Sequence, residues 1–290
     1  MRFHRLTLRD WIVNLYLRWR FNRIRNKEPY KLYNYSFKHK YKYLLIFEDD
    51  FDKISWNRSD PNRKWGIGED WGPYHPGWLN KYFGEPNLNG DSCAVFSVKY
   101  KPKEFIQEDG TKITIPYVAS WLNTVHSFTQ QYGRFECRMT LPKEKGSWPA
   151  FWLWGPTHPP EIDVIEAYGR DTGEDIVYQE INVHWRTKSG KHVHINPWRI
   201  KIDDYDEHIA DRFHEFVLEW DEKGMYFYTD GIKVFEFTNK KVLNRMYNAD
   251  GIKPFMLINN NIMKNIDGSD KDYHSEFKVD YVRAYRKRPD

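Results

Sequence analysis

Hydrophobic residues follow two different spacings along this chain. Between Leu6 and Arg25 they recur at the spacing of one side of a helix. The residues on this side are Leu8, Trp11, Ile12, Leu15, Tyr16 and Trp19. After Leu44 apolar and polar residues alternate in short segments, and a period of two predicts β-strands. We therefore expect a basic, partly helical N-terminal extension over residues 1–45 and an all-β domain over residues 46–290.

Two segments show the strand pattern clearly, residues 135–141 and residues 277–285. The second segment is predicted to place four residues on one face, namely Phe277, Val279, Tyr281 and Tyr285. The dipeptide Asp230-Gly231 separates two further alternating segments and suits the type I′ turn of a hairpin. Many short strands with regular turns, and no repeat of 20–50 residues, indicate a β-sandwich.

The N-terminal helix leaves three interpretations open. In the first it packs over the sandwich, with Leu8, Trp11, Ile12, Leu15 and Trp19 covering apolar surface. In the second it lies on a membrane surface, because a basic helix that carries tryptophan suits that position. In the third it docks a protein partner. Residues 2–42 hold most of the basic excess, with Asp10 and Glu28 as the only acids among them.

Neither a membrane-spanning helix nor a secretory signal is expected. No run of 18 apolar residues occurs, and a spanning helix needs about that length. Asp10 and Asn14 interrupt the apolar stretch near the N-terminus, and no small-residue cleavage site follows it. The compartment therefore stays unassigned.

Composition narrows the class of ligand. Aromatic residues make up 18% of the 290 residues, a surplus that suggests ring platforms for a flat ligand such as a sugar or a base. The formal net charge of +4 is mild and unlike that of a duplex-binding domain. Two cysteines, Cys93 and Cys137, permit one disulfide and exclude a four-cysteine zinc site.

Three acids lie close together in the segment Glu161-Ile162-Asp163-Val164-Ile165-Glu166. Its β-branched residues favour a strand, in which Glu161 and Asp163 point the same way. Strict alternation would turn Glu166 to the other face, so a bulge between Asp163 and Glu166 is needed to bring all three onto one surface. Crowded carboxyl groups cannot all ionise cheaply, so at least one pKa is expected to rise.

Paired carboxyl groups are the machinery of retaining glycosidases. Such enzymes need two of them about 5–5.5 Å apart, one to attack the anomeric carbon and one to protonate the leaving group. A solvated polar strand face is the simpler alternative, and it is commoner in antiparallel sheets. Residues 146–155, just upstream, hold Trp148, Trp152 and Trp154 among glycines and prolines. Tryptophans beside three acids favour the catalytic interpretation, because rings of this kind stack on sugars.

Several motifs together resemble glycoside hydrolase family sixteen, the group of laminarinases, lichenases, agarases and carrageenases. In the family's order they are Tyr132–Glu136, Gly146–Gly155, Glu161–Glu166, Phe213–Trp220 and Val279–Tyr285. The acidic segment matches the family's bulged E-x-D-x-x-E motif. The resemblance covers roughly residues 46–287 and implies a concanavalin-like β-jelly-roll sandwich of two antiparallel sheets. It also implies an endo-acting, retaining hydrolase of a β-linked glucan or galactan.

The resemblance also implies the catalytic roles. Glu161 matches the nucleophile, Glu166 the general acid/base and Asp163 the assisting acid. A transglycosylase would use the same carboxyl groups and pass the intermediate to a sugar. A lectin-like binding module on the same fold is the non-enzyme alternative, because fold does not fix function.

Substrate-binding residues are expected nearby. Trp148 and Trp152 match family tryptophans near the cleft, and His184 matches a histidine close to the cleaved sugar. Core packing is the alternative for each of the three. Weaker candidates for the cleft wall rest on composition alone, and they are Trp71, His75 and Trp78.

The remaining expectations concern partners and cofactors. The partner is a polysaccharide or oligosaccharide, and nucleic acid is excluded because three acids on one strand would repel phosphate. No cofactor or catalytic metal is expected, although a structural calcium ion would be compatible with the resemblance. We expect a monomer. Residues 254–262 lack glycines that often follow the family's late strand, so the polysaccharide itself stays open.

Overall fold

The computed structural model describes residues 7–27, 42–69, 71–75, 80–142, 144–155, 160–168, 176–195, 200–204, 212–246, 253–263, 266 and 268–289. Within these residues the helices are α1 (Leu8–Lys27) and α2 (Lys240–Met246). The strands are β1 (Tyr43–Asp49), β2 (Lys81–Gly84), β3 (Asn87–Leu88), β4 (Ala94–Ile106), β5 (Lys112–Asn123), β6 (Gly133–Met139), β7 (Ala150–Trp154), β8 (Glu161–Glu166), β9 (Ile176–Arg186), β10 (His192–Ile195), β11 (Ile200–Asp204), β12 (His214–Asp221), β13 (Gly224–Thr229), β14 (Ile232–Phe237), β15 (Phe255–Asn259) and β16 (His274–Lys287).

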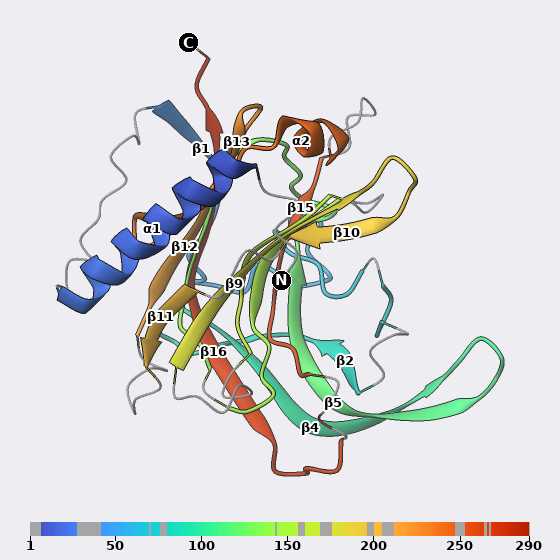
Figure 1. The fold of residues 1–290 in the computed structure, drawn as a ribbon. Helices are drawn as coiled ribbons and strands as arrows, with labels where there is room; N and C mark the ends of the chain where they lie inside the picture. The colour runs from blue at the N-terminus through green and yellow to red at the C-terminus, as the bar shows by residue number, and fades with distance from the viewer. Residues whose placement is uncertain are drawn as a thin grey trace.

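The strands form a sandwich of two mainly antiparallel layers (Figure 1). One layer has the order β10-β9-β8-β7-β15, and the other has the order β4-β16-β6-β12-β13-β14. β5 pairs with β4 along most of its length and with β15 at residues 121–123, so it joins the two layers. This arrangement confirms the predicted all-β jelly-roll sandwich.

The core lies between the apolar faces of the two layers. Ile162 and Ile165 of β8 belong to the same buried cluster as Phe135 of β6 and Phe216 of β12. All four side chains are fully buried, and burial of each stabilises the fold by about 1.5–3 kcal/mol. One face of β8 therefore packs in the core, and its opposite face points away from the core.

The predicted hairpin at Asp230-Gly231 is confirmed. β13 and β14 pair antiparallel and end on Thr229 opposite Ile232. Asp230 has φ of 48° and Gly231 has φ of 74°, as a type I′ turn requires at both central positions.

The predicted face of residues 277–285 is wrong beyond Val279. The register of β16 against β6 shifts between Val279 and Tyr281. After this bulge Val282 and Ala284 are the fully buried residues, and the Tyr281 hydroxyl instead donates a 2.8 Å hydrogen bond to Oε1 of Glu215. The extra residue reverses the alternation, so a strict period of two fails here.

Helix α1 is confirmed, but it packs with the side opposite to the expected one. The buried residues are Asp10, Asn14, Leu17 and Phe21, whereas the exposed ones are Leu8, Trp11, Ile12, Leu15, Tyr16 and Trp19. The helix does pack on the sandwich, as the first interpretation has it, but the prediction that Leu8, Trp11, Ile12, Leu15 and Trp19 cover its surface is wrong.

Hydrogen bonds explain this orientation of α1. The Asn14 side chain donates from Nδ2 to the carbonyl oxygen of Glu236 and accepts from the Glu236 backbone N–H, both at 2.8 Å. Glu236 lies in β14, which ends the strand order, and the backbone of such an edge strand needs partners. Thr238, just past β14, donates from its hydroxyl to Asp10. Polar residues of the helix thus complete the sheet edge, and the apolar side is left facing outward.

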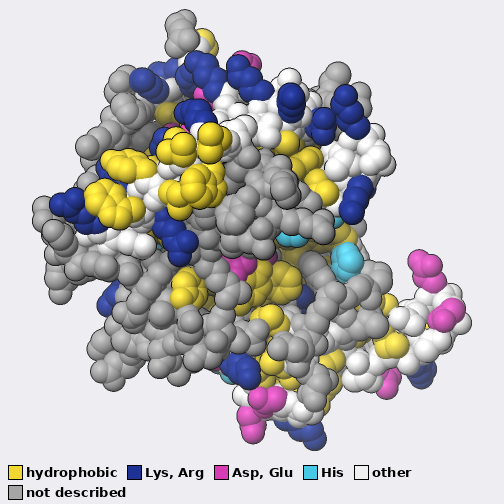
Figure 2. Space-filling view, in the orientation of Figure 1, with side chains coloured by type: hydrophobic (Ala, Val, Ile, Leu, Met, Phe, Trp, Pro, Cys, Tyr) yellow, Lys and Arg dark blue, Asp and Glu magenta, His cyan; other side chains and the backbone are white. Residues whose placement is uncertain are grey.

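Figure 2 shows the outward side of α1 as a group of hydrophobic side chains bordered by Lys and Arg. None of the described helices is long and apolar enough to cross a bilayer.

Cys93 and Cys137 are both buried free thiols, so the permitted disulfide is not formed between them. The division of the chain at residue 45 stays a prediction.

Candidate active site

The three acids of β8 lie on one surface because the strand is bulged. β8 pairs with β9 so that Glu161 lies opposite His184, Asp163 opposite Asn182, and Glu166 opposite Glu180. The register shifts between Asp163 and Glu166, as predicted from the sequence. The shift lets Val164 and Ile165 both enter the core while Glu166 returns to the face of the other two acids.

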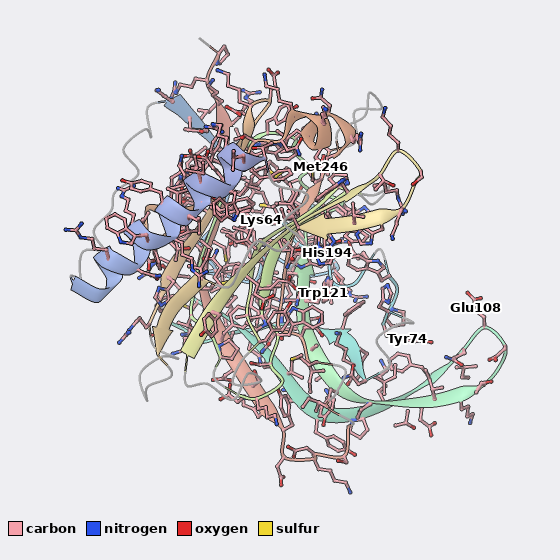
Figure 3. The ribbon with its side chains drawn as sticks, in the orientation of Figure 1. Lys64, Tyr74, Glu108, Trp121, His194 and Met246 are labelled. Atoms are coloured by element: carbon pink, nitrogen blue, oxygen red, sulfur yellow. The ribbon has the colours of Figure 1, made fainter. Side chains whose placement is uncertain are left out.

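A cavity of roughly 320 Å³ opens on this face, a size typical of small-ligand pockets. All six predicted site residues line it, and Figure 3 labels two further lining residues, Trp121 and His194. The complete lining is Trp121, Trp148, Ala150, Trp152, Glu161, Asp163, Glu166, Tyr168, Asn182, His184, His194, Asn259 and Asn261. Three acids and four aromatic rings therefore share one concave surface.

Glu166 is held by hydrogen bonds to both carboxyl oxygens. Trp148 donates from Nε1 to Oε1 at 2.7 Å, and Asn182 donates from Nδ2 to Oε2. The pKa of Glu166 is raised to about 8, mainly by burial and also by Asp163, while the hydrogen bonds from Trp148 and Asn182 act in the opposite direction. A carboxyl group with this pKa keeps its proton at neutral pH, as a general acid must.

Glu161 and Asp163 are linked through His184. The His184 Nε2 atom lies 3.0 Å from Oδ2 of Asp163, and its Nδ1 atom lies 3.7 Å from Oε2 of Glu161. Burial is the main cause that raises the pKa of Glu161 to about 8; Asp163 adds to the rise, and His184 opposes it. Burial also raises the pKa of Asp163 well above its usual range. The expected rise in carboxyl pKa therefore extends to all three acids.

Comparison with known proteins decides the family. A family model described as "Glycosyl hydrolases family 16" matches residues 94–283 of this chain. The chain belongs to this family.

This chain is similar in sequence to two proteins with curated descriptions and in structure to one solved catalytic domain. The endo-1,3-1,4-beta-glycanase ExsH of Rhizobium meliloti (strain 1021) is 30% identical over 174 residues, which cover 58% of this chain and 33% of ExsH. A beta-glucanase of Rhodothermus marinus is 25% identical over 268 residues, which cover 83% of this chain and 85% of the relative. This chain thus spans about a third of the length of ExsH.

The solved structure is the catalytic domain of an endo-1,3-beta-glucanase (laminarinase) from Thermotoga petrophila RKU-1. It has a TM-score of 0.58 and 24% identity, and the match covers 85% of this chain and 99% of that one. At this identity the likeness shows the shared fold, which is the sandwich described above.

Within this family-16 sandwich the tryptophans differ in their surroundings. Trp152 is buried, donates a 2.8 Å hydrogen bond from Nε1 to Oδ1 of Asn259, and stacks on Trp71 with ring centroids 6.1 Å apart. Trp148 is only half-buried and contacts Glu166. Trp71 and His75 pack together outside the set of lining residues, and Trp78 lies outside the described residues. Trp152 therefore combines core packing with cleft lining.

Several lining residues of the family-16 site were not predicted from the sequence, among them Tyr168, Asn182, His194, Asn259 and Asn261. One signal was present in β9. Asn182 and His184 alternate with Ile181 and Val183, which belong to the buried cluster. Because alternate residues of a strand share a face, the match of His184 to the cleft should have brought Asn182 with it.

Proposed function

We propose that this chain is an endo-acting β-glucan hydrolase that retains the configuration of the anomeric carbon. The observation that carries the proposal is the bulge in β8, which places Glu161, Asp163 and Glu166 on one wall of an aromatic-lined cavity. Retaining glycosidases need two such carboxyl groups close together. Glu161 is the proposed nucleophile, Glu166 the general acid/base, and Asp163 the assisting acid.

The proposed reaction has two steps. In the first, the Glu161 carboxylate attacks the anomeric carbon while Glu166 gives its proton to the leaving glycosidic oxygen, which leaves a glycosyl-enzyme ester. In the second, Glu166 takes a proton from water, and this water attacks the anomeric carbon and frees Glu161. Carboxyl groups supply both the nucleophile and the proton, so the reaction needs no metal or cofactor. A structural calcium ion stays a prediction.

The contacts of the two glutamates support their different proposed states, although burial raises the pKa of both. Glu166 has no ionised partner among its hydrogen bonds and is the more buried of the two, so it keeps the proton. Glu161 faces the His184 ring, whose Nδ1 lies 3.7 Å from Oε2, and this ring opposes the rise in the Glu161 pKa, which favours the carboxylate needed for attack. Asp163, hydrogen-bonded to the same ring, fixes its orientation.

Trp148, Trp152 and His184 are the proposed substrate-binding residues. Trp148 is the half-buried ring beside the acid and presents a face for sugar stacking. Trp152 lines the cavity with its indole N–H already bound to Asn259, so this ring offers the sugar its apolar surface. His184 lies between Glu161 and Asp163 and is within reach of the sugar that is cleaved. Action as a monomer stays a prediction.

A β-1,3 or mixed β-1,3-1,4 glucan is the proposed substrate, because the relatives described above are named for those linkages. The test is product release from a panel of laminarin, mixed-linkage glucan, agarose and carrageenan. Short oligosaccharides from laminarin or the mixed-linkage glucan are expected. Release from the galactans alone would show that the substrate is a galactan and not a glucan. Binding of a polysaccharide without release of products would instead indicate a lectin-like binding module. Longer products formed by joining oligosaccharides would identify a transglycosylase.

We also propose that α1 holds the enzyme against an anionic membrane surface. Its outward side carries two tryptophans, Trp11 and Trp19, and four further apolar or aromatic residues. Arg18 and Arg23 are also exposed on the helix, whereas the guanidinium of Arg9 is bound to Thr238, just past β14. Apolar residues enter the boundary between headgroups and acyl chains, and flanking arginines attract anionic lipid. Because the other side of α1 is hydrogen-bonded to β14, the outward side is presented as a fixed surface.

A further inference from the structure

Glu161, His184 and His192 form a group whose geometry resembles a metal site. The Nδ1 atom of His184 lies 3.0 Å from Nε2 of His192 and 3.7 Å from Oε2 of Glu161. One potential ligand atom from each residue lies within 4.8 Å of the others. Two ligands of one zinc ion, each bound at about 2.0–2.2 Å, are themselves about 3–4 Å apart. The three atoms therefore already have nearly the separations that a single ion imposes.

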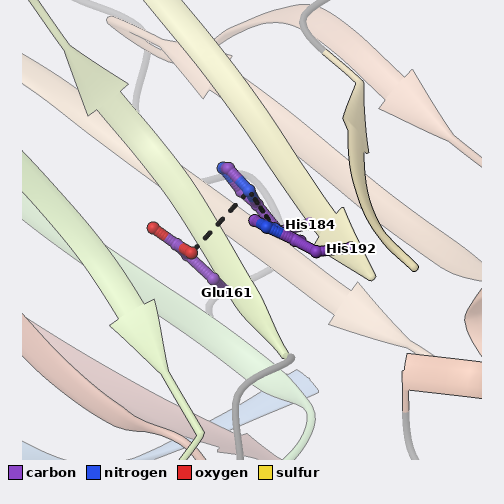
Figure 4. Close-up of side chains that lie close together, drawn as sticks. All are labelled: Glu161, His184 and His192. Carbon is purple, nitrogen blue, oxygen red and sulfur yellow. Dashed lines mark hydrogen bonds and ion pairs between the residues drawn. The ribbon is translucent and has the colours of Figure 1, made fainter. Parts of the chain in front are cut away.

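The scaffold of this group is rigid, because it spans three neighbouring strands. Glu161 lies in β8 opposite His184 in β9, and β9 pairs along its other edge with β10, which carries His192 (Figure 4). The His184 and His192 rings are nearly parallel, with centroids 5.2 Å apart. Sites supported by strands hold their ligands more accurately than sites on loops.

Metal-binding histidines usually donate a hydrogen bond from their other ring nitrogen to a carboxylate or carbonyl, and Asp163 is placed to accept one from His184. Its Oδ2 atom lies 3.0 Å from Nε2 of His184, the ring nitrogen turned away from His192. When Nε2–H donates to this carboxylate, Nδ1 carries the lone pair and points toward Glu161 and His192. Carboxylate–histidine–zinc arrangements of this kind fix the tautomer and raise the basicity of the ligand.

We propose that Glu161, His184 and His192 bind Zn²⁺, and that the bound ion inhibits the enzyme. Two imidazoles and one carboxylate suit a borderline cation such as Zn²⁺ better than Mg²⁺ or Ca²⁺, which prefer oxygen ligands. Zinc sites with three protein ligands also keep a position for water, which suits a group that opens on a cavity. The ion would take the Glu161 oxygen that the hydrolysis needs for attack. The inhibition therefore rests on the proposed nucleophile, whereas the binding does not.

Isothermal titration of the full chain with ZnCl₂ tests the binding directly. Wild-type protein is expected to bind one ion, and His192→Asn is expected to bind it at least about tenfold more weakly, since it loses a ligand. His192 is the right position for the change because it does not line the cavity. His274→Asn is the matched control, because His274 is another exposed histidine beside a carboxylate, 3.0 Å from Glu276. This control is expected to keep the wild-type affinity.

A second measurement compares hydrolysis with and without ZnCl₂ within each variant. Zinc should inhibit the wild type and His274→Asn, with recovery on addition of EDTA, and should inhibit His192→Asn much less. Absence of zinc binding by the wild type, or equal affinity in His192→Asn, would overturn the proposal. If zinc binding depends on His192 but no glucan is cleaved, the metal site stands and the proposed hydrolase activity fails. If glucan is cleaved but zinc does not bind, the proposed hydrolase activity stands and the proposed metal site fails.

Discussion

Trp148 donates a 2.7 Å hydrogen bond from its indole Nε1 to Oε1 of Glu166. The sequence indicated a stacking platform at position 148, and the structure adds a polar contact with the proposed general acid. A hydrogen bond to a carboxylate favours the ionised form, so this contact lowers the pKa of Glu166 against the effect of burial. Trp148 is therefore placed to influence both sugar binding and the proton supply.

Trp148→Phe separates these two effects, because phenylalanine keeps an aromatic face but has no N–H donor. The pKa of Glu166 should rise further, so the alkaline limb of the kcat/KM profile should move to higher pH. The indole N–H also stabilises the carboxylate that forms as Glu166 gives up its proton, so its loss should lower kcat by roughly tenfold. Trp154→Phe is the control, because Trp154 lies nearby in β7 but outside the cavity lining. An alkaline limb that stays in place would show that the indole N–H does not act on the acid.

Glu161→Gln should abolish turnover while oligosaccharide binding and the fold are retained. The amide has nearly the same shape as the carboxyl group but cannot attack the anomeric carbon, and the charge is needed only for the chemistry. Turnover should fall by several orders of magnitude, whereas oligosaccharide affinity measured by calorimetry should stay close to that of the wild type. Glu104→Gln, on the exposed part of β4, is the matched control. Wild-type turnover in Glu161→Gln would remove the proposed mechanism.

Retention should be visible in the first product. In a double displacement the anomeric carbon is attacked twice, so a β-linked substrate should give the β-anomer before mutarotation mixes the two forms. Proton NMR during the first minutes of hydrolysis measures this ratio. An initial α-anomer would indicate a single displacement by water. One carboxyl group would then activate this water as a general base, and Glu161 would not be a nucleophile.

Stability should respond to pH through Glu161. Its pKa is raised from 4.5 to about 8 in the folded chain. A group with a raised folded-state pKa stabilises the fold fully below its unfolded pKa, and this contribution is lost as pH rises through the folded value. Between about pH 5 and about pH 8 the wild type should therefore lose stability relative to Glu161→Gln, which cannot ionise there.

The expected difference is a few kcal/mol at the alkaline end, because each pKa unit corresponds to about 1.4 kcal/mol. Thermal melts of both proteins across this range measure it, with Glu104→Gln as the reference for general pH effects. Parallel Tm curves for the wild type and Glu161→Gln would mean that Glu161 is not desolvated in the folded protein.

Local sequence patterns predicted two features of the fold correctly, the bulge in β8 and the turn between β13 and β14. The bulge in β8 follows from three acids spaced unevenly among β-branched residues, and the turn at Asp230-Gly231 follows from a dipeptide that tolerates positive φ. Both depend on neighbours within a few positions, which a sequence displays directly.

Features that depend on distant partners were missed. The bulge in β16 after Val279 arises where that strand meets β6, and no nearby residue signals it. The buried side of α1 is set by Asn14, whose backbone partner Glu236 is 222 positions away. The hydrophobic stripe on α1 was correctly located, but its exposure follows from this polar contact, which outweighs the tendency of the stripe to face the core.

The proposed membrane contact of α1 is best tested on its outward side. Removal of residues 1–42 would also remove Leu17 and Phe21 from the buried surface and leave the Glu236 backbone without Asn14, so truncation should lower Tm whatever the helix does. A double variant, Trp11→Ser with Trp19→Ser, avoids this problem, because the two rings are 37% and 55% exposed.

Cosedimentation with vesicles that contain phosphatidylserine measures the contact. The wild type should bind them, bind less at high salt because charges are screened beyond about 8 Å at physiological ionic strength, and bind purely zwitterionic vesicles weakly. The double variant should lose vesicle binding and keep the wild-type Tm and turnover on soluble glucan. Ile54→Ser is the control, because Ile54 is 58% exposed, at least as much as either tryptophan, but lies outside the helix. Equal vesicle binding by the wild type and the double variant would place the lipid contact elsewhere, and failure of the wild type to bind would leave the outward side of α1 to a protein partner.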